Sequence, residues 1–120
     1  MKKIHIALSS HNIEAAVQDY TARLACEPCV VIAGEYALWR TASLNLSVRQ
    51  DANAQPGTLR HLGWEDAEAA EFTEDVDSHG IVWERFNAAT QAQEIRSLWP
   101  ETDYRPSSAS VRRDSTTKSR

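Results

Sequence analysis

Two histidines, His5 and His61, occupy equivalent places in two stretches of the chain that resemble each other. The first stretch reads IHIALSSHNIEAAVQDY from Ile4, and the second reads RHLGWEDAEAAEFTEDV from Arg60. In each, histidine is the second residue of a short strand-like segment, a small residue (Ala7 or Gly63) follows two positions later, and an EAA sequence comes next. Side chains of a strand alternate between faces, so each histidine shares a face with its small neighbour. We therefore expect the two imidazoles to be symmetry mates beside space for a ligand.

Hydrophobic periodicity predicts the elements that would position these histidines. We expect a strand at residues 3–9 and then a helix that is capped by Asn12 and runs to about residue 25. Further strands are expected at residues 29–33, 36–41, 44–50 and 59–65. A second helix is predicted at 67–79 with Gly80 as its C-cap, followed by strands at 81–88 and 93–99. The loop DANAQPGT at 51–58 separates the two halves. The order is βαβββ followed by βαββ, with an eighth strand available only from the weak segment 107–113.

The length and the charge distribution limit the classes of protein to consider. The 120 residues suffice for one domain with its own core. Residues 105–120 contain five basic residues and one acidic residue, which leaves a net charge of −8 on the other 104 residues of a chain whose total is −4. An acidic body argues against nucleic acid as a partner. No apolar run approaches the length of a membrane helix, so we expect a cytoplasmic protein with no membrane partner and a basic, flexible tail at 105–120.

The two cysteines form the sequence Cys26-Glu27-Pro28-Cys29 at the end of the first predicted helix. Redox CxxC motifs usually open a helix, where the helix dipole lowers the thiol pKa, and this one lies at the unfavourable end. A zinc site would need more soft ligands than this motif offers. The pair is interpreted as part of a helix-to-strand turn, with capture of a soft metal or metalloid as the alternative.

Several short sequences, taken together in order and spacing, resemble the vicinal oxygen chelate superfamily. They are His5-Ile6-Ala7-Leu8, Asn12-Ile13-Glu14, Tyr20, Glu27-Pro28, Tyr36-Ala37, Leu44-Asn45-Leu46 and His61-Leu62-Gly63. This superfamily includes glyoxalase I, bleomycin-resistance proteins, fosfomycin-resistance enzymes and extradiol dioxygenases. The nearest resemblance is to its cadmium-induced and arsenic-lyase-like branch. It implies an α+β fold of two βαβββ modules, at 1–52 and 58–104 in a single domain 1–104, whose curved mixed sheets enclose a cavity. The second module is degenerate at its last strand.

The resemblance also implies a metal site with His5 and His61 as ligands. The family would place a glutamate on its last strand, where residues 108–110 of this chain hold no acid. Glu101 or Asp103 could substitute for it, or a second chain could supply the ligand. One divalent ion (Zn, Fe, Mn or Ni) is then expected, and the alternative is a protein without metal, because two imidazoles alone bind these ions weakly.

The four tryptophans favour a different function, binding without catalysis. The expected cleft is lined by Tyr36, Trp39, Asn45, Trp64 and Trp99, and an aromatic cleft in an acidic body suits a flat, cationic small molecule. The sequence thus favours a sequestration protein resembling bleomycin-resistance proteins. The alternative is a metal-dependent glyoxalase-like lyase or dioxygenase that uses His5 and His61. An open sheet edge at the degenerate last strand predicts a homodimer, with strand swapping as one form.

Overall fold

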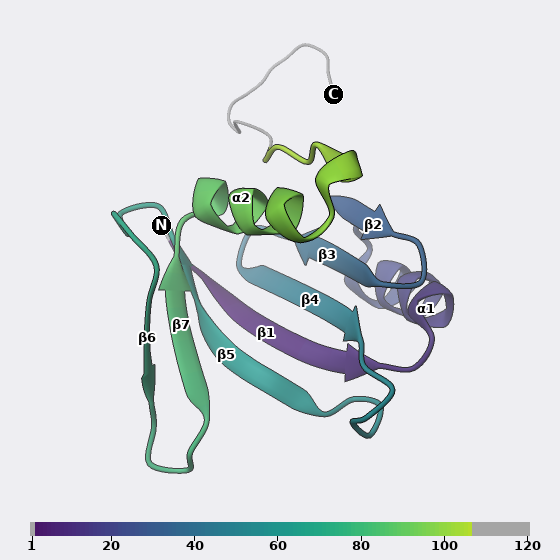
Figure 1. Ribbon diagram of the computed structural model, residues 1–120, viewed down its shortest axis with the longest axis horizontal. Helices are drawn as coiled ribbons and strands as arrows, with labels where there is room; N and C mark the ends of the chain where they lie inside the picture. Colours follow the sequence, from purple (N-terminus) through teal and green to yellow (C-terminus); the bar gives the residue numbers. More distant parts are fainter. Residues whose placement is uncertain (1, 107–120) are drawn as a thin grey trace.

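The residues that the structure describes form a single mixed sheet of seven strands, together with two α-helices. The computed structural model covers residues 2–106, and its strands lie in the order β2-β3-β4-β1-β5-β7-β6 (Figure 1). The protein is therefore of the α+β class, with a sheet that is mixed but open and does not close into a barrel. The predicted pair of βαβββ modules is not confirmed, because the second half of the chain has a different order of elements.

The first half of the chain follows the predicted order of elements. It consists of β1 (Lys2–Ser10), α1 (Ile13–Leu24), β2 (Val30–Ile32), β3 (Tyr36–Arg40) and β4 (Leu44–Gln50). The predicted cap of α1 is confirmed, because the Asn12 side chain accepts a hydrogen bond from the Ala15 amide at 3.0 Å. β4 returns beside β1 and pairs with it in parallel.

The second half differs from the predicted order. Its elements are β5 (Leu59–Asp66), β6 (Thr73–Val76), β7 (Val82–Phe86), α2 (Ala88–Leu98) and the short 3₁₀ helix η1 (Pro100–Thr102). The prediction of a helix at 67–79 was wrong. Asp66 starts a turn there, because its side chain accepts a hydrogen bond from the Glu68 amide, and β6 follows. The strand predicted at 93–99 was also wrong, because α2 occupies those residues up to Leu98. Gly80 lies in the β6–β7 turn at φ 82° rather than at a helix end.

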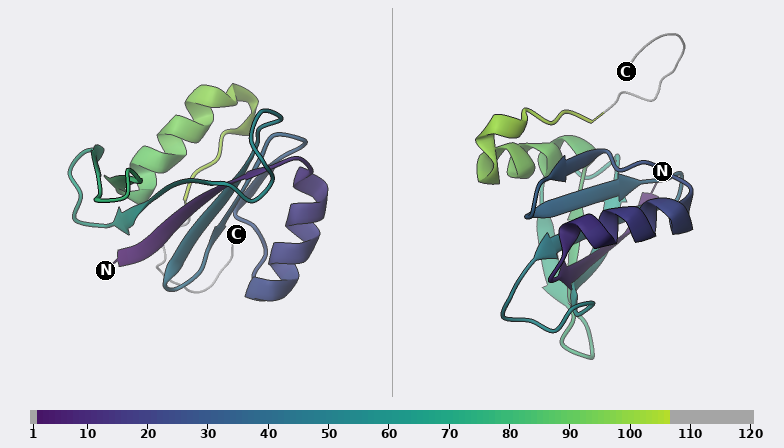
Figure 2. Two further views of the ribbon diagram at one scale, coloured as in Figure 1. Left: turned by 90° about the horizontal axis from the view of Figure 1, so that it is seen from below. Right: turned by 90° about the vertical axis from the view of Figure 1, so that its right-hand side faces the viewer.

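The helices lie on opposite faces of the sheet (Figure 2). Alternation along β3 explains why each face has its own core. Ala37 and Trp39 pack with Ile13 of α1 on one face, whereas Tyr36 and Leu38 pack with residues of the α2 side on the other. The histidines of β1 and β5 face the α2 side, so α2 is the element that covers the candidate site.

The strands at the two edges of the described sheet are β2 and β6. The weak segment 107–113, from which an eighth strand was expected, and most of the predicted basic tail lie outside the described residues. The predicted homodimer stays a prediction. Within residues 2–106, neither helix has both the length and the apolar character that a membrane crossing requires.

Candidate metal centre

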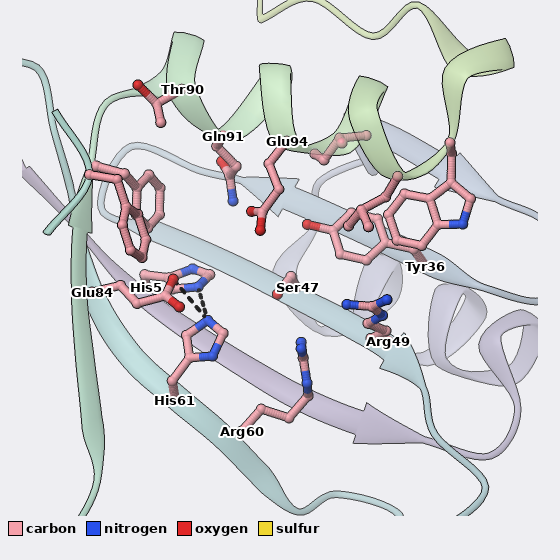
Figure 3. Close-up of a pocket in the computed structure, with 15 residues that line it drawn as sticks. His5, Tyr36, Ser47, Arg49, Arg60, His61, Glu84, Thr90, Gln91 and Glu94 are labelled. Atoms are coloured by element: carbon pink, nitrogen blue, oxygen red, sulfur yellow. Dashed lines mark hydrogen bonds and ion pairs between the residues drawn. The ribbon is translucent and has the colours of Figure 1, made fainter. Parts of the chain in front are cut away.

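A cavity of about 370 Å³ lies between the sheet and α2. Its size is in the range of small-molecule sites. Strands supply its floor and α2 its roof (Figure 3). Its lining mixes aromatic, apolar and charged side chains: His5, Tyr36, Ser47, Arg49, Arg60, His61, Phe72, Glu84, Phe86, Thr90, Gln91, Glu94, Ile95, Leu98 and Trp99.

Three potential metal ligands, His5, His61 and Glu84, converge at one end of this cavity (Figure 3). The Nε2 atoms of His5 and His61 are 3.0 Å apart, and His61 Nε2 is 3.2 Å from Glu84 Oε1. One ligand atom from each residue lies within 4.8 Å of the other two. His5 is only 3% exposed, whereas the His61 and Glu84 side chains keep 17% and 21% of their surface exposed. The group therefore has a buried side and a side that opens to the cavity.

Strand register brings the three side chains together from distant parts of the sequence. In the antiparallel pairing of β1 with β5, His61 lies opposite Ala7 and His5 lies opposite Gly63, so the two histidines are diagonal neighbours on one face. In the parallel pairing of β5 with β7, Gly63 lies beside Glu84. A Cβ atom at position 63 would overlap the backbone carbonyl of Glu84. Glycine there allows β7 to approach β5 closely enough to bring Glu84 to His61.

Behind His5, a chain of buried polar side chains fixes the orientation of its ring. His5 Nδ1 lies 2.8 Å from Asn45 Oδ1, and Asn45 Nδ2 donates to Glu65 Oε1 at 2.8 Å. Asn45 Nδ2 also donates to Gln91 Oε1 at 2.8 Å. Glu65 in turn accepts two hydrogen bonds from Arg40, at 2.9 and 2.7 Å. Because an amide oxygen only accepts, His5 carries its hydrogen on Nδ1 and presents the lone pair of Nε2 to the other ligands.

Burial and hydrogen bonding set the protonation states in this chain. Burial lowers the pKa of His5, although its hydrogen bond with Asn45 opposes the shift in part, and the ring is therefore neutral at neutral pH. Burial opposes ionisation of Glu65, but the hydrogen bonds from Arg40 and Asn45 outweigh it and hold the pKa of this carboxyl below its usual value. The same ion pair raises the pKa of Arg40. Glu65 is thus a carboxylate that holds Asn45 in the orientation needed by His5.

The three ligand atoms fit a divalent cation in both chemistry and spacing. Two imidazoles and one carboxylate form a ligand set that suits Zn, Fe, Mn or Ni. With ligand distances of about 2.1 Å, neighbouring ligand atoms lie roughly 3.0 Å apart in octahedral and roughly 3.4 Å apart in tetrahedral geometry. Two of the three separations, at 3.0 and 3.2 Å, fall in that range, and the third, between His5 and Glu84, is at most 4.8 Å. Two imidazole nitrogens this close repel each other unless a proton or a cation lies between them. His5, His61 and Glu84 could therefore hold a metal ion, and nothing in the geometry selects which one.

The predicted ligand-binding residues fall into two groups. Tyr36 and Trp99 line the cavity, with ring centroids 4.9 Å apart. Asn45 does not line it but accepts a hydrogen bond from His5 Nδ1. Trp39 is fully buried on the opposite face, where its Nε1 donates to Thr21 Oγ1. Trp64 is 36% exposed and its ring lies 6.4 Å from that of Trp83, also outside the cavity lining. Alternation along each strand accounts for these positions.

The predicted third ligand, Glu101, lies elsewhere. It is exposed on η1 and does not line the cavity, and Asp103, the other candidate, is also exposed. The carboxylate that joins the histidines is Glu84, which the sequence reasoning missed. A signal for it was present, because strand alternation at 82–86 places Glu84 on the same face as the apolar residues Val82 and Phe86. A charged residue on such a face is a candidate for a specific role.

The two cysteines lie outside the cavity lining. Both are free thiols, and Cys26 Sγ lies 3.9 Å from the Arg40 carbonyl oxygen. Their expected place in the turn between α1 and β2 is confirmed. They do not contribute to the group formed by the two histidines and Glu84.

Comparisons with known proteins show likeness at the level of fold only. The chain matches no protein-family model and no curated protein. Among solved structures, a hypothetical protein from Staphylococcus aureus matches 72% of this chain at a TM-score of 0.51 and 11% identity. The chain spans 33% of that protein's length. The NAD-dependent benzaldehyde dehydrogenase from Legionella pneumophila matches 70% of this chain and 97% of its own, at a TM-score of 0.48 and 12% identity.

Proposed function

We propose that the protein binds one divalent metal ion through His5, His61 and Glu84 and uses it to act on a small molecule in the adjoining cavity. The observation that carries the proposal is the convergence of the three ligand atoms, with separations of 3.0 and 3.2 Å, at the cavity end. The function is that of a metal-dependent lyase or dioxygenase, such as those of the vicinal oxygen chelate superfamily that the sequence resembles. The resemblance supports the roles of the two histidines, and the structure adds Glu84.

The supporting side chains have the arrangement that metal ligands usually need. Histidine ligands commonly use their second ring nitrogen in a hydrogen bond that fixes the tautomer, and Asn45 gives His5 such a partner. The open side of the group faces the cavity, where a substrate oxygen would complete the coordination. A divalent ion held here would act as a Lewis acid on that oxygen. The protein's own side chains would bind, orient and partly enclose the substrate.

Equilibrium dialysis of untagged, metal-free protein tests this proposal. The protein is dialysed separately against micromolar Zn, Fe(II), Mn or Ni, and the bound metal is measured by elemental analysis. We expect one ion per chain for at least one metal and loss of that ion in a His61→Ala variant. If none of the four metals binds, or if the variant retains full binding, the proposal is wrong.

A second candidate function, sequestration of an aromatic molecule without catalysis, is favoured by the aromatic pair at the other end of the cavity. The rings of Tyr36 and Trp99 lie 4.9 Å apart with an interplanar angle of 31°, and both line the cavity. A flat ligand could pack against them. Thermal-shift measurements of metal-free protein with a panel of flat, cationic drugs separate the two functions. Stabilisation without metal supports sequestration, and its absence throughout the panel contradicts it.

A further inference from the structure

Two arginines, Arg49 and Arg60, line the same cavity without a partner in the described part of the chain. Neither side chain forms an ion pair or a hydrogen bond with any of residues 2–106, although Arg40, Arg85 and Arg96 each have a partner. Both are half-buried. The Arg49 guanidinium lies 5.4 Å from the centre of the Trp99 ring, and this stacking positions it without neutralising its charge. A half-buried cation with no anionic partner is suited to receive one from a ligand.

A local irregularity of the sheet places Arg60 in the cavity. Strand alternation would direct the neighbouring residues Arg60 and His61 to opposite faces. The pairing of β5 with β1 shifts at this point, however, because Ala7 lies opposite His61 and Leu8 lies opposite Leu59. Arg60 is the extra residue, and such a bulge reorients a side chain. Both Arg60 and His61 therefore line the cavity, and Arg60 extends toward its interior (Figure 3).

The charges of the cavity select the type of ligand. Apart from the two histidines, its charged side chains are Arg49, Arg60, Glu84 and Glu94, so two positive charges offset two negative ones. A divalent ion at His5, His61 and Glu84 would leave an excess of two positive charges. Burial raises the pKa of Tyr36, which therefore stays protonated and can donate a hydrogen bond at the same wall of the cavity. The excess charge and this donor favour a ligand with two negative charges.

We infer that the substrate is a small dianionic acid: one oxygen-bearing end contacts the metal, and a second anionic group, carboxylate or phosphate, is held by Arg49 and Arg60. This inference rests on the proposed metal function and adds the substrate class. The register between β1 and β4 sets how far Arg49 lies from the metal ligands. Arg49 is two positions beyond Ser47 and four beyond Asn45 on the same face of β4, and Asn45 lies beside His5. Along β4 this is about 13 Å between Cα atoms, and the long arginine side chains that line the cavity shorten the gap that the ligand has to bridge.

Isothermal titration of Mn-loaded protein with three probes tests the inference. Malate carries two carboxylates, 2-phosphoglycolate carries one carboxylate and one phosphate, and glycolate carries a single carboxylate. We expect malate or phosphoglycolate to bind at least about tenfold more tightly than glycolate. Which of the two binds more tightly distinguishes a carboxylate from a phosphate at the arginine end.

Arg49→Gln and Arg60→Gln should each remove most of the tighter binding of malate or phosphoglycolate over glycolate, and should change glycolate binding by less than about threefold. Arg23→Gln, on the exposed surface of α1, is the control of equal charge change.

A gain of binding provides a readout that misfolding cannot imitate. Glu94 shares the cavity with the two arginines, so Glu94→Gln removes a competing negative charge and should tighten dianion binding about two- to fivefold. Metal content is measured on the same samples. If metal is bound but the three probes bind equally well, the inference is overturned and the metal function stands. If neither metal nor dianion binds, both are overturned. If no metal binds and the dianion still binds through the arginines, the metal function and the metal contact of the substrate are both overturned, and only the arginine site is supported.

Discussion

The hydrogen bond between His5 Nδ1 and Asn45 Oδ1, at 2.8 Å, connects the candidate metal ligands to a buried ion pair. Asn45 is fully buried and is held by Glu65, which is paired with Arg40. Asn45→Leu removes this acceptor and leaves only the backbone carbonyl of residue 45, which is 3.2 Å from His5 Nδ1, so the tautomer with its hydrogen on Nδ1 should be favoured less strongly and metal binding should weaken about tenfold. Nitrogen chemical shifts of the His5 ring report the tautomer directly. Gln91→Ala is the matched control, because Gln91 forms hydrogen bonds with Asn45 and none with His5, and it should retain the tautomer. An unchanged tautomer and metal affinity in Asn45→Leu would contradict the assigned role of Asn45.

Gly63 should be intolerant of even one added methyl group. In Gly63→Ala the new Cβ would overlap the Glu84 carbonyl, and β5 and β7 would have to separate. We expect a loss of about 1–3 kcal/mol in the free energy of unfolding, together with weaker metal binding, because Glu84 moves away from His61. Gly34→Ala is the control: it is strained at φ 71°, but its Cβ would meet nothing within 4 Å and it lies in the β2–β3 turn. It should lose stability and keep its metal affinity. Chemical denaturation and dialysis measure the two effects, and equal metal binding in both variants would argue against this account of Gly63.

The Arg40–Glu65 pair should make stability depend on acid pH. Its side chains are only 14% and 9% exposed, so Glu65→Gln leaves Arg40 without its partner and should cost about 3–5 kcal/mol of unfolding free energy at pH 7. The folded-state pKa of Glu65 lies below its usual value of 4.5. Its stabilisation is therefore complete above that value and is lost as the pH falls through the lowered folded-state pKa. Urea unfolding from pH 7 to pH 3 should show this loss in the wild type and a smaller loss in Glu65→Gln. The exposed Arg23–Asp19 pair gives the comparison, and Asp19→Asn should cost less than about 1 kcal/mol.

The first half of the fold could be predicted from sequence because its signals are local. Alternating residues in β1 and the Asn12 cap of α1 mark those elements unambiguously. The segment after Asp66 was harder, because Ala69, Phe72 and Val76 recur at helical spacing. Phe72 and Val76 are in fact 45% and 63% exposed, so they form no apolar helix face against the sheet. The helix signals lay later, in the Asn87 cap, which accepts from the Thr90 amide at 2.7 Å, and in the inward residues Ala92 and Ile95.

The candidate site was predictable in part. The repeated sequence context identified His5 and His61, which the structure brings to 3.0 Å. Glu84 gave a local signal as a charged residue on an apolar face, but its place beside the histidines, like the place of Arg60 in the cavity, depends on how neighbouring strands pair. Glu84 requires the parallel pairing of β5 with β7, and Arg60 requires the bulge opposite Ala7 and Leu8. Neither the strand order nor a register shift can be read from one strand alone.

Metal titration of variants at the two rival carboxylates tests the central claim most directly. The claim is that Glu84, and not Glu101, completes the group formed with His5 and His61. Metal-free wild type, Glu84→Gln and Glu101→Gln are titrated with Co(II), and the visible absorption bands report the number and type of ligands. We predict one Co(II) per chain in the wild type, unchanged binding and spectrum in Glu101→Gln, and an altered spectrum with affinity reduced at least about tenfold in Glu84→Gln. Wild-type binding in Glu84→Gln, or its loss in Glu101→Gln, would contradict the account.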